Sequence, residues 1–150
     1  MNAKQIHEER GQRTFALVFE AGDEVVLGLT NFAGGNGLAA ASFTAIGAFG
    51  TATLGYFDLE KKEYEQIPVH EQVEVLSLLG DIAQKEDEEP QVHAHAVLGA
   101  SDGSTRGGHL LEARVRPTLE VVLVESPEHL RRRWDEEVGL ALISIDGGRH

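Results

Sequence analysis

Three histidines lie close together in the sequence and could bind one metal ion. His93 and His95 are separated by a single residue in a segment typical of a β-strand, and His109 follows a loop rich in glycine, serine and aspartate. Side chains two residues apart project from the same face of a strand. We therefore expect His93 and His95 to share a face.

A hairpin would bring the third histidine to the other two. If the chain turns at Asp102–Gly103, His109 comes to lie opposite His95, and Leu111 opposite His93. Directly opposed residues have Cβ atoms about 4.5–5.5 Å apart, so three imidazoles can converge on one ion. Neutral imidazole suits zinc, nickel, iron or copper, and we predict a divalent transition metal, with zinc as the first candidate.

Two other interpretations of these histidines stay open. In the first, they are separate surface residues that bind nothing. In the second, they form a catalytic site, because three protein ligands with an open fourth position are typical of catalytic zinc. A metal-dependent enzyme of unknown reaction would also need a general base, for which the sequence offers no candidate, so a non-enzymatic role is favoured. The other four histidines are interpreted as surface residues; they are His7, His70, His129 and His150.

The charge of the chain argues against nucleic-acid binding by the protein as a whole. Acidic residues outnumber Lys and Arg by 25 to 13, which gives a formal net charge of −12. DNA, in contrast, is bound largely by Lys and Arg that neutralise its phosphates. The basic cluster Arg131–Arg133 is followed by acids at Asp135–Glu137, and the two are predicted to pair on the face of a helix.

Composition also indicates in which compartment the protein works. There is no cysteine, so neither disulfides nor thiolate metal ligands are available. Residues 1–10 carry acids where a signal peptide needs an apolar run, and no later stretch has the length of a membrane span. We expect a cytoplasmic protein without membrane contact, and one domain over residues 1–150.

Hydrophobic patterns predict mostly strands. A polar turn at residues 58–63 indicates a hairpin in which Tyr56 and Phe57 pair with Tyr64. Between residues 39 and 57, Gly47, Gly50 and Gly55 interrupt what would otherwise be two strands, and they predict bulges or a close approach of the backbone. Short apolar or alternating segments predict the other strands at residues 14–20, 73–79, 91–98, 108–116, 118–125 and 140–145.

Two segments have the pattern of helices. Asp23 is expected to cap a helix that ends at Gly34–Gly35. Ser126 and Pro127 are typical of a helix start, and the second helix is predicted to run to Gly139. The expected fold class is α+β, a mostly antiparallel sheet with two or three helices packed against it.

Four ordered motifs are distinctive; they are residues 41–47 (ASFTAIG), 73–80 (VEVLSLLG), 93–95 (HAH) and 107–110 (GGHL). They are similar to those of the PPC (plants and prokaryotes conserved) domain family, over roughly residues 13–145. The resemblance implies an antiparallel sheet with a few helices, self-association into homotrimers, and a polar site at the positions of the three histidines. Plant members carry a separate AT-hook that binds DNA, whereas no Arg-Gly-Arg-Pro hook occurs here.

The leading functional hypothesis is a homotrimeric regulatory or binding domain with a metal or small-ligand site at His93, His95 and His109. The first alternative is a transcription-associated regulator that binds DNA through self-association. The second alternative is the metal-dependent enzyme.

Overall fold

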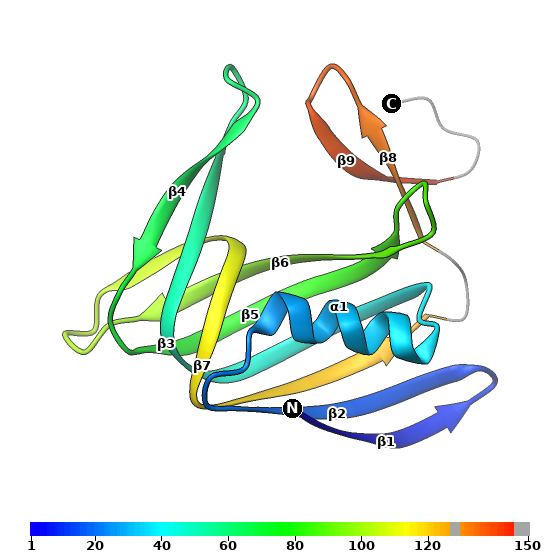
Figure 1. Cartoon of the computed structure of the whole chain (residues 1–150), viewed down its shortest axis with the longest axis horizontal. Coiled ribbons are helices and arrows are strands. Elements are labelled where there is room, and N and C mark those ends of the chain that lie inside the picture. Colours follow the sequence, from blue (N-terminus) through cyan, green and yellow to red (C-terminus); the bar gives the residue numbers. More distant parts are fainter. Residues whose placement is uncertain (127–129, 146–150) are drawn as a thin grey trace.

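The computed structural model describes residues 1–126 and 130–145. This part of the chain is 68% strand and forms one large mixed sheet of nine strands with a single helix (Figure 1). The elements are β1 Asn2–Glu9, β2 Gln12–Glu20, α1 Val25–Asn36, β3 Ala40–Asp58, β4 Glu63–Val69, β5 Val73–Gln84, β6 Pro90–Gly99, β7 Thr105–Glu125, β8 Arg131–Asp135 and β9 Leu140–Ser144.

The fold class expected from the sequence, with two or three helices, is wrong. Residues Arg131–Asp135 form a strand, β8, that pairs antiparallel with β9 where the second helix was predicted. In β8, Arg132 is buried and lies between two exposed arginines. Alternation of buried and exposed side chains every two residues is typical of a strand, not of a helix. The cap signal at Ser126 was local and was outweighed by strand pairing; residues 127–129 lie outside the described residues.

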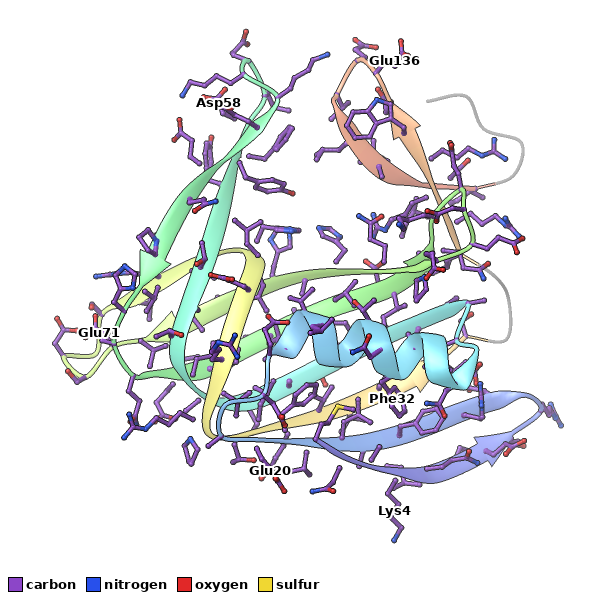
Figure 2. The ribbon with its side chains drawn as sticks, in the orientation of Figure 1. Lys4, Glu20, Phe32, Asp58, Glu71 and Glu136 are labelled. Atoms are coloured by element: carbon purple, nitrogen blue, oxygen red, sulfur yellow. The ribbon has the colours of Figure 1, made fainter. Side chains whose placement is uncertain are left out.

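The one helix of the described residues packs against the sheet. Its buried residues are Val25, Leu29, Phe32 and Ala33, and the ring of Phe32 meets that of Phe15 on β2 edge-on, at 5.1 Å between centroids (Figure 2). The predicted helix is confirmed, but its boundaries differ. Glu24 rather than Asp23 is the N-cap, and the helix continues through Gly34–Gly35 to a left-handed Gly37. No helix of the described residues is long and apolar enough to cross a membrane.

Two long strands replace four predicted short ones. β3 runs through its glycines with shifts of register, and β7 continues through the cis peptide Arg116–Pro117. Gly47 has φ of 150°, and a Cβ at this position would collide with the carbonyl oxygen of Thr118. The predicted bulge and close backbone approach are therefore confirmed at Gly47, although β3 continues past it. β3 pairs with β5, β5 with β6, β6 with β7, and β7 again with β3.

Other strand predictions are confirmed with small changes of length. β2, β5, β6 and β9 occupy predicted segments, and Phe57 pairs with Tyr64 in the β3–β4 hairpin. β1 was not predicted, because all eight of its residues are exposed and no apolar alternation marks it.

Two hairpins project from the same end of the sheet. The β3–β4 and β8–β9 hairpins stand side by side at the top of Figure 1, and Figure 2 labels Asp58 and Glu136 near their turns. The turns touch, because Lys62 Nζ donates a 2.6 Å hydrogen bond to the carbonyl oxygen of Glu136. The three histidines lie on the sheet near the base of these hairpins, where β6 and β7 pair.

Candidate metal centre

The structure brings the three histidines together. His95 pairs directly with His109 across β6 and β7, as the hairpin argument predicts. The Nε2 atoms of His93 and His95 are 3.2 Å apart, and one nitrogen from each of the three rings lies within 4.8 Å of the others. The three imidazoles therefore form one cluster.

Two ring contacts hold His109 in place. Its imidazole is stacked on the ring of Tyr64 at 4.7 Å and on that of His93 at 5.1 Å. Gly55 pairs with His109 on β3, and a Cβ at Gly55 would lie only 2.7 Å from Cδ1 of Tyr64. Glycine at this position leaves room for the tyrosine ring that supports the histidine.

A carboxylate and an arginine lie behind His93. Asp81 on β5 pairs with His93 on β6, and its Oδ2 is 3.5 Å from His93 Nδ1. Arg132 on β8 is buried and donates a 2.6 Å bond from Nη2 to Oδ1 of the same carboxylate. Sequence reasoning missed Asp81 and Arg132 because their contact joins residues far apart in the chain; the pairing of β5 with β6 would have revealed Asp81.

The electrostatic environment favours the neutral form of His95 and His109. Burial, followed by the nearby charges of His93, His95 and Arg132, lowers the pKa of His109 to about 4. Burial, followed by the charge of His93, also lowers the pKa of His95. A neutral imidazole is the form that binds a metal, so these two side chains need not lose a proton at neutral pH.

Asp81 is held in its ionised form. Burial alone would raise the pKa of this carboxyl, but hydrogen bonds from His93 and Arg132 outweigh that effect, and the pKa is lowered. An ionised carboxylate accepts the Nδ1–H of His93 and leaves Nε2 of that ring without a proton. That nitrogen is the one that faces His95.

The donor set fits a transition metal. Two nitrogens bound to the same tetrahedral zinc at 2.0–2.1 Å lie about 3.3 Å apart, close to the 3.2 Å between His93 and His95. Nδ1 of His109 is buried and has no hydrogen-bond partner within the part of the chain that the structure describes. His7 and His70 are exposed and do not join the cluster, whereas His129 and His150 lie outside the described residues.

Comparison with known proteins identifies the family. Residues 6–127 match the profile of the Plants and Prokaryotes Conserved domain, abbreviated PCC or PPC. The chain belongs to this family. No curated protein matches it.

Solved structures support the same assignment. A PPC protein from Pyrococcus horikoshii is 36% identical, with a TM-score of 0.83 over 89% of this chain and 92% of its own. A metal-containing protein from Archaeoglobus fulgidus is also 36% identical, with a TM-score of 0.83 over 95% of this chain and 100% of its own. A third similar protein, from Ralstonia eutropha JMP134, is named as a candidate DNA-binding protein. It is 30% identical, with a TM-score of 0.82 over 87% of this chain and 90% of its own.

Proposed function

We propose that this PPC-domain protein is a homotrimeric binding domain that holds a divalent transition metal, with zinc as the first candidate, at His93, His95 and His109. The observation that carries the proposal is the convergence of three imidazoles, each offering a nitrogen within 4.8 Å of the others. The similar protein from Archaeoglobus fulgidus is described as metal-containing, which agrees with it. A metal bound by three neutral ligands would supply a Lewis acid with room for a further ligand.

Asp81 is a positioning residue in this proposal. Metal-binding histidines usually donate their second ring N–H to a carboxylate or carbonyl, which fixes the ring and its tautomer. Asp81 lies 3.5 Å from His93 Nδ1 and is itself held by Arg132. The arginine thus connects the β8–β9 hairpin to the metal site.

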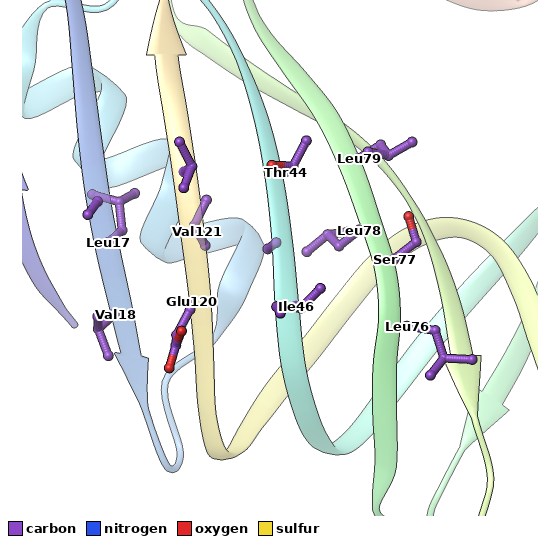
Figure 3. A pocket seen from close by; sticks show the side chains of 13 residues that line it. Leu17, Val18, Thr44, Ile46, Leu76, Ser77, Leu78, Leu79, Glu120 and Val121 are labelled. Atoms are coloured by element: carbon purple, nitrogen blue, oxygen red, sulfur yellow. The ribbon is translucent and has the colours of Figure 1, made fainter. Parts of the chain in front are cut away.

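An open apolar face of the sheet supports self-association. Ile46, Leu76 and Leu79 are 63%, 53% and 56% exposed and, with Val18 and Val122, surround a hollow of about 480 Å³ (Figure 3). A contiguous apolar surface of this kind is typical of a protein interface. The PPC family resemblance implies a trimer, and a second copy of the chain is the occupant that we propose for this face.

Metal analysis tests the central proposal. Untagged protein, equilibrated with zinc and then freed of unbound metal, is expected to retain about one zinc per chain. His95→Ala should lose most of it, because two imidazoles are left, whereas His7→Ala changes an exposed histidine on β1 and should retain it. Retention below about a tenth of an equivalent by the wild type, or equal retention by both variants, would refute the metal site.

A DNA-binding regulator is the second candidate, favoured by the name of the Ralstonia eutropha protein. The net charge of −12 opposes it, so binding would need a local basic surface of the oligomer. Titration with duplex DNA should then show affinity that falls steeply between about 50 and 200 mM salt. Absence of binding at the lower salt concentration would end this alternative.

A further inference from the structure

A pocket of about 220 Å³ lies next to the candidate metal site. It is lined by His93 and His109, by Tyr64 of β4, and by Trp134 of β8. The pocket therefore lies between the two hairpins that project together in Figure 1, whose turns are joined by the bond from Lys62. The histidines form one wall and the hairpins supply the others.

The protein groups around this site leave the charge of a bound metal unbalanced. The three imidazole ligands are neutral. The nearby carboxylate, Asp81, is already paired with the guanidinium of Arg132, at 2.6 Å. A divalent ion in a partly buried site favours an anion beside it, because burial strengthens the interaction between charges.

Arg132, which also lines the pocket, has one side-chain donor without a partner among the described residues. Its Nη1 donates to the carbonyl oxygen of Ala141 and its Nη2 to Asp81, whereas its Nε has no partner among the described residues. Arginine nitrogens only donate, so the complementary group is an acceptor such as an oxygen anion.

The rest of the pocket is small and mostly apolar; Gln91 is the polar exception, and its Oε1 has no hydrogen-bond partner among the described residues. The β8–β9 hairpin contributes Trp134, Leu140 and Leu142 to the lining of the pocket, and β4 contributes Tyr64. An apolar cavity of about 150 Å³ accommodates benzene, so 220 Å³ is enough for a ring with one carboxylate. Most drug-sized ligands need about 300 Å³ or more and are excluded by size.

We infer that the metal and this pocket together bind a small organic carboxylate of about the size of benzoate, an inference that rests on the metal site proposed above. The carboxylate balances the charge of the metal, and the organic group lies between Tyr64 and Trp134. The family match ends at residue 127, before the β8–β9 hairpin begins. The part of the apolar wall that the β8–β9 hairpin supplies therefore comes from residues beyond the matched range, whereas Tyr64 lies within it.

Calorimetric titration of the zinc-loaded protein with benzoate tests the inference, with benzamide as the uncharged ligand of the same shape. Zinc content is measured first in every sample. Benzoate is expected to bind with Kd of about 1 mM or lower and at least about tenfold more tightly than benzamide. Trp134 is the only tryptophan of the chain, so its fluorescence should change along the same binding curve.

Variants of the apolar wall separate the pocket from the metal. Trp134→Ala should retain zinc but bind benzoate at least about tenfold more weakly, whereas Trp134→Phe should bind it nearly as well as the wild type. Full zinc with no saturable benzoate binding up to about 10 mM, or with no preference over benzamide, overturns the inference and leaves the metal site standing. Failure to retain zinc overturns both.

Discussion

The two faces of the sheet carry the same kinds of apolar residue but are used differently. Phe49, Leu78 and Leu119 on the covered face are fully buried, whereas Ile46 and Leu79 on the open face are more than half exposed. Leu78 and Leu79 are neighbours in one strand, so hydrophobicity alone does not tell which side chain forms the core. The difference indicates that the covered face stabilises the fold of one chain; the open face and the histidines beside it are the surfaces to which the proposed function assigns binding.

The largest loss of stability is expected on the covered face. Phe49→Ala removes a fully buried aromatic ring from the core and should lower the free energy of unfolding by about 3–5 kcal/mol. Urea unfolding followed by circular dichroism measures this change. A loss below about 1 kcal/mol would mean that this face is not the packed core.

The second largest effect is expected on zinc affinity, from a change at Asp81. Asp81→Asn keeps the size of the side chain but removes the charge that orients His93, and zinc affinity should fall by about 10–100-fold. Competition with a chromogenic chelator measures the affinity. His70→Ala, which changes an exposed histidine outside the cluster, serves as the control and should leave it unchanged. Unchanged zinc affinity in Asp81→Asn would show that the carboxylate does not position the ligand.

A smaller loss is expected where the helix begins on the covered face. Glu24 accepts a 2.5 Å hydrogen bond from the backbone N–H of Leu27 and a 3.1 Å bond from that of Ala113. Glu24→Ala should lower the free energy of unfolding by about 1 kcal/mol. Glu71→Ala is the control, since Glu71 is exposed and lies outside the helix. If the two variants lose equal stability, the cap assignment is wrong.

The smallest effect on folding is expected on the open face. Ile46→Lys should change the free energy of unfolding of the isolated monomer by no more than about 0.5 kcal/mol, because this side chain is 63% exposed. It should nevertheless convert trimers to monomers, as measured by light scattering. Leu59→Lys is the matched control, as Leu59 is 66% exposed at the turn of the β3–β4 hairpin. A monomeric wild type would contradict the proposed trimer.

Local patterns predicted the histidine cluster well. The shared face of His93 and His95 follows from the period of a strand, and the pairing of His95 with His109 follows from a turn a few residues away. Both arguments concern a short stretch of chain. The helix α1 was predicted for the same reason, since its buried face repeats with the helical period.

Features that depend on distant pairing could not be predicted in this way. A shift of register between Val75 and Ser77 exchanges the faces of β5, so Leu78 becomes buried and Leu79 exposed, against the simple alternation. Strand β8 was predicted as part of a helix because the cap signals before it are local, whereas the contact of Arg132 with Asp81 joins residues far apart in the chain.

The central claim is that one metal ion is held by the three histidines, and anomalous diffraction at the zinc absorption edge tests it most directly. In crystals of zinc-loaded protein, the account predicts one strong peak per chain, about 2.0–2.1 Å from a nitrogen of each of His93, His95 and His109. A peak at other residues, or no peak in protein shown to contain zinc, would contradict the account.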